Sequence, residues 1–469
     1  MKTQKEIIKS KEESKKKTIK TKVKSQNERA DPKEKAQEDK VITEEKTKIE
    51  TPVSEATTEL ILINISGADR QGLTAELTEI LSKHDADILD IGQADIHHTL
   101  SLGILFKTDS QKSGEILKEL LFRTNEMKIQ VSFSIITEEE YEDWVGRQGK
   151  NRYIITILGR KITAAQIAAT TKEISRQGLN IDSITRLSGR MPLKEEELPV
   201  AKSCIEFSVR GTPKDFVGMQ EQLLNLSRKL NYDISLQEDT IYRRCRRLVC
   251  FDMDSTLIKT EVIDELADRA GVGPEVRQIT EAAMRGEIDF RESFTRRVSL
   301  LKGLDVEVMR EIAENLPMTE GMEHMMKILK RSGYKTAILS GGFTYFGNYL
   351  KQKYGFDYVY ANELEIGEDG KLTGRFIGDI VDGLRKKELL RLLAQVENID
   401  IAQTIAVGDG ANDLPMLSEA GLGIAFHAKP KVKAEASQSI STIGLDGVLY
   451  LLGFKDSYIM PGPSAVKKP

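Results

Sequence analysis

Three short apolar runs in the C-terminal half of the chain each end abruptly at polar residues and glycines. An apolar run with polar flanks is typical of a buried strand, and in an open parallel sheet functional groups gather beyond the carboxyl ends of the strands. If the runs are parallel neighbours, a hydroxyl, glycine amides and several carboxylates meet at one edge of an α/β fold. The runs with their polar ends are Leu248–Phe251 before Asp252 and Asp254, Thr336–Leu339 before Ser340, Gly341 and Gly342, and Thr404–Val407 before Gly408, Asp409, Asn412 and Asp413.

The carboxylates at this edge suit a displacement at phosphorus. A carboxylate nucleophile divides the displacement into formation and hydrolysis of an aspartyl-phosphate, and a second acid protonates the leaving oxygen and later deprotonates water. Asp252, which closes its strand, and Asp254, in the loop that follows, are predicted to fill these roles. Mg²⁺ prefers oxygen ligands and keeps several waters. We therefore predict a Mg²⁺ site at Asp252, Asp409 and a backbone oxygen of Asp254, which Asp413 steadies or joins.

Phosphate oxygens also need hydrogen-bond donors and a fixed cation. Ser340 supplies a hydroxyl, and Gly341 supplies an amide in backbone that can closely approach an anion. Lys386 is the predicted cation that offsets the charge at phosphorus. Since Arg385 and Lys387 flank it, an assignment shifted by one position stays open.

Composition restricts the classes of partner and the compartment. No apolar run approaches the roughly 20 residues that a membrane helix needs, and no secretory signal is recognisable, so we expect no membrane partner. The first 50 residues carry 16 Lys and Arg against 11 Asp and Glu, which leaves a net charge of −9 for the remainder. This acidic remainder disfavours nucleic acid as a partner. Cys204, Cys245 and Cys250 lack metal-ligand spacing and are predicted to be free thiols of a cytoplasmic protein.

Composition and the pattern of apolar residues divide the chain into tails, a repeat and a catalytic region. The N-terminal tail is rich in Lys and Glu, lacks aromatic residues and is predicted to be disordered. A mitochondrial transit peptide is the alternative, but it would be Arg-rich and acid-poor. The predicted segments are the tail 1–55, the first repeat 57–140, the second repeat 150–240, the catalytic region 245–454 and the C-terminal tail 455–469.

The repeat is a βαββαβ pattern of strands and helices that occurs twice. Asn180–Ile184 of the second copy matches Asp87–Ile91 of the first at an offset of 93, and residues 138–150 are predicted to be a linker. Both copies resemble the ACT domain, a ferredoxin-like module that often binds an amino acid to regulate an attached enzyme. The resemblance implies an amino-acid effector and, because such modules often pair through their sheets, a homodimer. A purely structural or dimerising role is the alternative.

One loop of the first copy is close to the form that the ACT family has. This loop is Gly67–Gly72, and the resemblance implies that Gly67, Asp69 and Gly72 contact a regulatory ligand. The second copy has Leu158–Thr163 at the same place, so the resemblance does not extend ligand binding to both copies.

The catalytic region resembles the phosphoserine phosphatases of the haloacid-dehalogenase superfamily. It carries four motifs of that superfamily in order and at suitable intervals. The resemblance implies a Rossmann-like core with a parallel sheet and a helical cap at about 265–318, since the residues between the first two strands far exceed the roughly 10 to 12 of a minimal crossover. The motifs are Asp252–Thr256, Ser340–Gly342, Lys386 and Gly408–Asp413.

The resemblance also implies a reaction. An enzyme of this family hydrolyses O-phospho-L-serine to L-serine and phosphate, the last step of serine biosynthesis, with Mg²⁺ as cofactor and an aspartyl-phosphate intermediate. Glu261 would meet the substrate ammonium and Arg297 the carboxylate, which a guanidinium binds with two parallel hydrogen bonds. The other implied substrate contacts are Met284, Phe290, Ser340, Gly341 and Asn412.

Several alternatives stay open at this point. The phosphatase could act on another phosphorylated amino acid, or pass the phosphoryl group to an alcohol in place of water. The chain could also be an amino-acid sensor, although its complete set of motif residues argues against a degenerate enzyme. For Glu261 and Arg297, the alternative is that they are ordinary surface charges of helices. Ser255 and Thr256 are interpreted as loop-capping and phosphate-contacting residues, because no His or Lys base is close in sequence.

Overall fold

The computed structural model describes residues 57–146, 149, 151–190, 201–436 and 438–459. The chain divides into two compact units, residues 1–142 and 143–469. The predicted tail 1–55 and residues 460–469 of the predicted C-terminal tail lie outside the described residues. Within the described ranges, no helix is long and apolar enough to cross a membrane.

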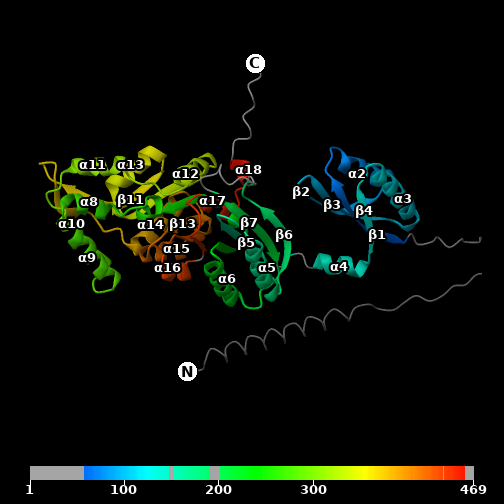
Figure 1. The fold of residues 1–469 in the computed structure, drawn as a ribbon, viewed down its shortest axis with the longest axis horizontal. Helices are drawn as coiled ribbons and strands as arrows, with labels where there is room; N and C mark the ends of the chain where they lie inside the picture. Colours follow the sequence, from blue (N-terminus) through cyan, green and yellow to red (C-terminus); the bar gives the residue numbers. More distant parts are fainter. Residues whose placement is uncertain (1–56, 147–148, 150, 191–200, 437, 460–469) are drawn as a thin grey trace, which may run out of the picture. The chain divides into compact units, whose positions relative to one another are not determined.

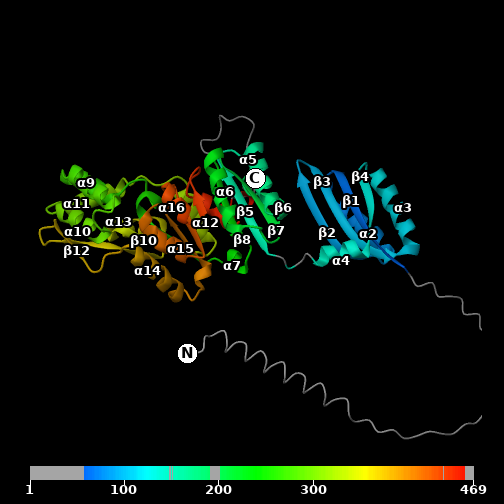
Figure 2. The same ribbon diagram turned by 90° about the horizontal axis from the view of Figure 1, so that it is seen from below.

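The first unit contains a four-stranded antiparallel sheet with strand order β2-β3-β1-β4, drawn in blue and cyan in Figures 1 and 2. Alternate residues of β1, Ile61, Ile63 and Ile65, are buried in one core with residues of the two helices, as the two-residue period of a strand requires. The predicted βαββαβ order is confirmed. The elements are β1 (Thr58–Ala68), α2 (Leu73–Lys83), β2 (Asp87–Ile96), β3 (Thr99–Asp109), α3 (Ser110–Glu126) and β4 (Gln130–Ile136).

The segment predicted to be a linker contains a helix, α4 (Glu138–Gly146). Its first turn carries Glu138, Glu139 and Glu140, and negative charge is favourable at the positive end of the helix dipole. Glu140 also accepts hydrogen bonds from the backbone N–H and hydroxyl of Thr137, at 2.9 and 3.0 Å. None of its described residues is buried, so no apolar face could reveal the helix in the sequence.

The second unit begins with a copy of the same sheet, in the order β6-β7-β5-β8. The position of each strand matches that of its counterpart in the first unit, so the predicted duplication is confirmed. We call this copy the second ACT-like module. Its elements are β5 (Arg152–Gly159), α5 (Ala164–Arg176), β6 (Asn180–Arg186), β7 (Ser203–Arg210), α6 (Phe216–Leu230) and β8 (Asp233–Glu238).

A seven-stranded sheet forms the centre of the catalytic region, in the order β12-β11-β10-β9-β13-β14-β15. Its central strand β9 (Leu248–Phe251) pairs in parallel with β10 (Lys335–Phe343) and β13 (Thr404–Gly408). The three predicted runs are therefore parallel neighbours. Ile338 and Val407 both lie opposite Phe251, so their polar ends are at the same level. The other strands are β11 (Tyr358–Ile366), β12 (Leu372–Ile377), β14 (Leu422–Phe426) and β15 (Gln438–Ile440).

Helices cover both faces of this sheet. Val249 and Phe251 of β9 join a core with helices α12 and α13, whereas Leu248 and Cys250 join a second core with α14 and α15. The alternation explains why β9 is apolar throughout, because a strand buried on both faces has no polar side. The covering helices are α12 (Met322–Arg331), α13 (Thr344–Tyr354), α14 (Gly383–Val396), α15 (Leu414–Glu419), α16 (Pro430–Glu435) and α17 (Gly447–Leu451).

A helical cap is inserted between β9 and β10, as predicted. It begins at Val262, slightly before the expected position. Phe294 of the cap is buried and packs against Phe343 of the core, with ring centroids 6.0 Å apart, so the cap shares the core of the sheet on this side. The cap helices are α8 (Val262–Ala270), α9 (Gly273–Met284), α10 (Phe290–Leu300) and α11 (Val306–Glu314).

The second ACT-like module joins the seven-stranded sheet edge to edge, through β8 and β15. The buried Gln438 side chain accepts a hydrogen bond from Leu236 N at 3.0 Å and donates one to Leu236 O at 2.8 Å. A side-chain amide thus takes the place of a backbone pair. Asp233, also buried, accepts from the backbone N–H groups of Ser441 and Thr442, each at 2.9 Å.

Candidate active site

The polar ends of β9, β10 and β13 bring the predicted catalytic residues together. Asp252 follows β9 directly, and the turn after it contains Ser255 with φ 56°. This left-handed conformation is uncommon outside glycine and directs the chain back over the strand end. Asp252 is 5% exposed, and its Oδ1 accepts the backbone N–H of Met253 at 2.7 Å.

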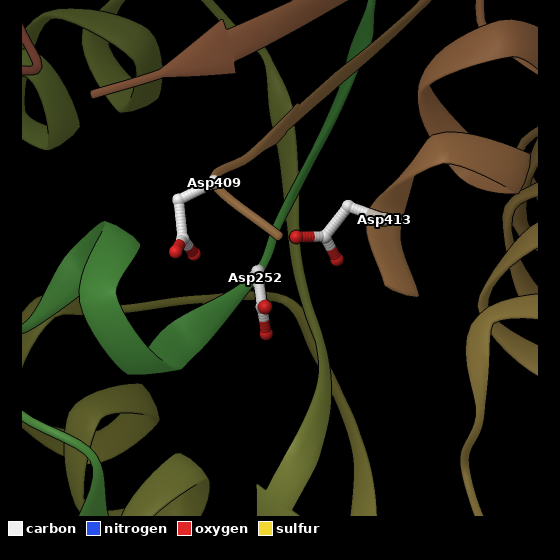
Figure 3. A group of neighbouring side chains, drawn as sticks. All are labelled: Asp252, Asp409 and Asp413. Atoms are coloured by element: carbon white, nitrogen blue, oxygen red, sulfur yellow. The ribbon is translucent and has the colours of Figure 1, made fainter. Parts of the chain in front are cut away.

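Three carboxylates form a cluster at this edge. Asp252, Asp409 and Asp413 each have an oxygen within 4.8 Å of the others, and Figure 3 shows the three side chains converging from β9 and from the loop after β13. Thr256 donates its hydroxyl to Asp409 at 3.2 Å, and Gly410 donates its backbone N–H to Asp413 at 3.0 Å. The cluster is therefore held by donors from two loops.

Lys386, in the first turn of α14, is the cation of the cluster. It is fully buried, and its Nζ lies 2.9 Å from Asp252 Oδ1 and 2.7 Å from Asp413 Oδ1. Its neighbours point elsewhere, since Arg385 pairs with Glu388 and Lys387 with Glu419. Burial alone would lower the pKa of Lys386, but the two aspartates outweigh it and raise the pKa, so the ammonium stays charged.

One lysine does not balance the negative charge of the cluster. Burial, followed by the charges of Asp252 and Asp413, raises the pKa of Asp409 to about 8. Burial and Asp252 raise the pKa of Asp413 to about 7. Carboxylate oxygens are the ligands that a hard divalent cation prefers, and one oxygen from each of the three aspartates lies within 4.8 Å of the others. The donor set therefore fits a hard divalent cation.

Asp254 is buried close to Glu261 and Asp252. Its Oδ1 accepts the backbone N–H of Val262 at 3.2 Å, and a Cβ on Gly342 would stand 2.4 Å from its Oδ2, so only glycine leaves room for it. Burial, then the charges of Glu261 and Asp252, raise the pKa of Asp254. A protonated carboxyl group at this position can donate to a leaving oxygen.

The Ser340–Gly342 segment, where the pairing of β10 with β11 shifts register, is fixed by a residue that the sequence analysis missed. Ser340 is fully buried, and its hydroxyl accepts the N–H of Gly342 at 2.9 Å. Asn362 donates its amide to Gly341 O at 2.8 Å and accepts the N–H of Val381 at 2.8 Å. Tyr358–Ala361 is a fourth apolar run that meets a polar residue, so the rule used for the other runs would have indicated Asn362.

The cap and the residue before it bring three predicted substrate contacts, Glu261, Arg297 and Phe290, near this edge. Glu261 accepts the hydroxyl of Ser255 at 2.8 Å, and burial raises the pKa of its carboxyl group, although part of its surface is exposed. Burial lowers the pKa of Arg297, and the negative charge of the nearby Glu261 acts in the opposite direction. Phe290 lies against Gly341, where an added Cβ would be 3.1 Å from the ring.

Two predicted contacts lie at the margin of the site. Met284, at the end of α9, is 67% exposed, and its sulfur lies 3.6 Å from Lys429 Nζ, so it marks the boundary between cap and core. Asn412 is half-buried in the loop after β13, beside Asp413. Its backbone oxygen packs so closely on Gly383 that a Cβ there would lie at 2.5 Å.

The predicted regulatory loop belongs to the first unit. Gly67 packs against Ile129, and a Cβ added at Gly67 would lie only 2.5 Å from this side chain. Gly72 has φ 87° at the start of α2. Asp69 is exposed and donates its backbone N–H to His98 O at 2.9 Å. The loop is therefore an exposed turn between β1 and α2 that needs glycine at two positions.

The chain is similar to family models and to known proteins. Residues 59–134 and 152–237 match family models described as ACT domain, and residues 246–421 match haloacid dehalogenase-like hydrolase. A phosphoserine phosphatase of Streptomyces coelicolor is 38% identical over 84% of this chain and 92% of the relative. One of Mycobacterium tuberculosis is 37% identical over 84% and 93%. The crystal structure of a probable phosphoserine phosphatase of Vibrio cholerae covers 64% of this chain and 86% of its own, with 34% identity and a TM-score of 0.50. The chain therefore belongs to the phosphoserine phosphatase family, with a haloacid dehalogenase-like hydrolase domain that follows two ACT domains.

Proposed function

We propose that this chain hydrolyses O-phospho-L-serine to L-serine and phosphate through an aspartyl-phosphate at Asp252, as the last step of serine biosynthesis. The observation that carries the proposal is the convergence of Asp252 after β9, Asp254 in the turn that follows and Lys386 of α14, whose ammonium lies 2.9 Å from Asp252. Glu261 and Arg297 extend the site with one group of each sign, which complements the ammonium and carboxylate of an amino acid. The names of the relatives support the same substrate.

The contacts of Asp252 indicate which oxygen attacks. Its Oδ1 is bound by Met253 N and Lys386 Nζ, at 2.7 and 2.9 Å, whereas no described residue donates a hydrogen bond to Oδ2. We assign Oδ2 as the nucleophile. Asp254 gives its proton to the seryl oxygen as the P–O bond breaks, and the resulting carboxylate then takes a proton from the water that hydrolyses the aspartyl-phosphate.

We propose Mg²⁺ as the cofactor, held by Asp252, Asp409, Asp413 and the backbone oxygen of Asp254. When bound, it supplies positive charge that neutralises the phosphoryl oxygens. Ser340 and Gly341 offer a hydroxyl and an amide to the same oxygens, and we assign Asn412 and Phe290 as further substrate contacts. We place Met284 at the entrance, where its exposure leaves it less influence on binding.

Phosphate release from O-phospho-L-serine, with and without Mg²⁺, tests the proposal directly. Metal-dependent turnover that exceeds turnover of O-phospho-L-threonine supports both chemistry and substrate. Faster phosphate release from another phosphorylated amino acid would identify that compound as the better substrate. Transfer of phosphate to an added alcohol would indicate a phosphotransferase. Hydrolysis of an aryl phosphate without any action on phosphoserine would refute the roles of Glu261 and Arg297.

Metal binding is expected to weaken as the pH falls. The raised pKa values of Asp409 and Asp413, about 8 and about 7, mean that the metal-free protein holds protons that a cation must displace. The apparent Kd for Mg²⁺ should therefore be at least about tenfold higher at about pH 6 than at about pH 8. Calorimetry in two buffers with different heats of ionisation measures both the Kd and the released protons. A Kd independent of pH, with no proton release, would contradict the expectation.

Replacement of Arg297 by Lys is expected to impair substrate selection and spare the chemistry. A lysine keeps the charge but loses the planar pair of donors, so kcat/KM for phosphoserine should fall about 10- to 100-fold. Hydrolysis of an aryl phosphate, which has no carboxylate, should stay unchanged. Arg296→Lys is the matched control, because Arg296 is exposed and pairs with Glu292 in the same helix. Equal losses on both substrates would show that Arg297 does not read the carboxylate.

We further propose that an amino acid such as serine binds the first ACT domain, near Gly67, Asp69 and Gly72, and restrains activity. Family membership and the exposed loop support this site, and we propose a homodimer because such sheets commonly pair. Asp69→Ala should weaken inhibition by serine, with the exposed Asp85→Ala as control. Inhibition that is equal in both variants would refute the site. The free thiols of Cys204, Cys245 and Cys250 support a cytoplasmic location.

A further inference from the structure

The cap is connected to the core by two chain segments that pair with each other. Residues 257–259 lead into α8, and residues 317–319 lead from α11 toward α12. Because the chain enters and leaves the cap here, a rotation of the cap must bend this pair, which we call the hinge ladder. The hinge ladder consists of the antiparallel bridge Ile258–Met318 and of backbone hydrogen bonds from Lys259 N to Pro317 O at 2.8 Å and from Thr319 N to Leu257 O at 3.0 Å.

The inner end of the hinge ladder is continuous with the active site. Thr256, the residue before it, donates its hydroxyl to Asp409 at 3.2 Å. Glu261 lies just beyond the first segment, and the next residue, Val262, donates its N–H to Asp254 at 3.2 Å. A displacement of the hinge ladder therefore moves the substrate-selecting Glu261 relative to the catalytic edge.

The second ACT-like module holds the outer end. Glu320 directly follows the hinge ladder, and its carboxylate accepts two hydrogen bonds from Arg160, at 2.8 and 2.7 Å. Its backbone oxygen accepts the N–H of Leu445 at 2.7 Å. Arg160 lies in the loop between β5 and α5, the counterpart of the exposed loop Gly67–Gly72 of the first unit. In this copy the loop contacts the catalytic region of its own chain.

Arg160 belongs to the second ACT-like module, which is joined to the catalytic region by several contacts. The Gln438 and Asp233 contacts join the two sheets. Lys202 forms an ion pair with the buried Asp446, which directly precedes α17 and lies against Gly321 at the start of α12. Figure 1 shows the module beside α17, whose residues contact β5. A guanidinium that forms two parallel hydrogen bonds has a fixed orientation, so the pair with Glu320 transmits the position of the module to the hinge ladder.

We propose that Arg160 is a positioning residue of the phosphatase: by holding Glu320 it fixes the hinge ladder and keeps Glu261 and Arg297 of the cap aligned with the catalytic edge. The inference rests on the proposed function. It also gives the second module a role distinct from that of a ligand sensor. The loop between β5 and α5, which would meet an effector, instead holds Glu320 through Arg160; we call this ion pair the brace.

Arg160→Met tests the brace by kinetics. With the hinge ladder loosened, KM for phosphoserine should rise about three- to fivefold, the range of a partly exposed ion pair, with kcat and aryl phosphate hydrolysis unchanged. Lys161→Met is the matched control, since Lys161 is exposed in the same loop. The double variant Arg160→Glu with Glu320→Arg should recover the KM of the wild type. Equal losses on both substrates, or a double variant as impaired as Arg160→Met, would overturn the proposal.

Amide hydrogen exchange in the full chain gives a readout that needs no turnover. The N–H groups of Lys259 and Thr319 should exchange about three- to fivefold faster in Arg160→Met than in Lys161→Met, because the ladder opens more often. Exchange rates that are equal in the two variants would overturn the brace. If the wild type does not hydrolyse phosphoserine, the proposed function fails alone, and the exchange comparison still decides whether Arg160 holds the hinge ladder.

Discussion

Asp252→Asn is expected to reduce phosphate release from O-phospho-L-serine by about 10⁴-fold or more, the scale seen when a nucleophile is removed. An amide oxygen can still accept the hydrogen bonds of Met253 and Lys386 at the position of Oδ1, but the neutral side chain cannot form the acyl-phosphate bond. Single-turnover assays with radiolabelled substrate should show no phosphate bound to the variant protein. The wild type should carry acid-stable, base-labile phosphate during turnover.

The fold of this variant should be intact. Removal of one of several crowded carboxylates lowers the repulsion at the site, so the thermal midpoint should match or exceed that of the wild type. Asp268→Asn, in an exposed ion pair with Arg277, is the matched control and should keep full activity. If Asp252→Asn retained more than about 1% of wild-type turnover, a loss far smaller than nucleophile removal causes, the nucleophile would have to be sought elsewhere.

Lys386→Met is expected to abolish activity and to destabilise the protein by about 3 kcal/mol or more, because removal of one partner leaves buried charges uncompensated. The ammonium lies 2.9 Å from Asp252 and 2.7 Å from Asp413, and no described side chain of the cluster other than Lys386 carries positive charge. Urea unfolding of the metal-free protein measures the loss of stability, and phosphate release measures the loss of activity.

The pH dependence of the stability of Lys386→Met distinguishes uncompensated charge from a packing defect. Burial, followed by the charge of Asp252, already raises the pKa of Asp413 to about 7, and loss of the lysine should raise this pKa further. The loss of stability should therefore be larger above about pH 8 than near about pH 5, where Asp413 is protonated. Lys387→Met is the matched control, since Lys387 is partly exposed and pairs with Glu419 at 3.0 Å. A loss of stability that is equal at both pH values, or equal in the control, would contradict the charge argument.

The sequence predicted that polar residues meet at one edge of the sheet, because the signal for the end of a buried strand is local. A strand buried on both faces must be apolar along its length, so the first polar residue marks its end. Leu248–Phe251 and Thr404–Val407 follow this rule, and the parallel register then brings Asp252 and Asp409 to one level. The repeat was equally readable, since each copy contains the same alternation of strands and helices.

Other features depend on contacts that no local pattern encodes. Arg160 and Glu320 are 160 positions apart, and nothing near either residue indicates its partner. Helix α4 has no buried face to create a period in the sequence. The exposure of Met284, which the resemblance implies as a substrate contact, is set by its place at the end of α9, and no pattern in the sequence indicates it.

The amide bridge from Gln438 to Leu236 has a consequence for assembly. An unpaired edge strand can add a strand from another molecule, and a sheet in the order β6-β7-β5-β8 has two such edges. The β8 edge is covered by Gln438 and by β15, so among the described residues β6 is the edge of this sheet that has no strand beside it. The second module cut out alone would uncover β8 as well. Its self-association in isolation would therefore misrepresent which oligomers the intact protein can form.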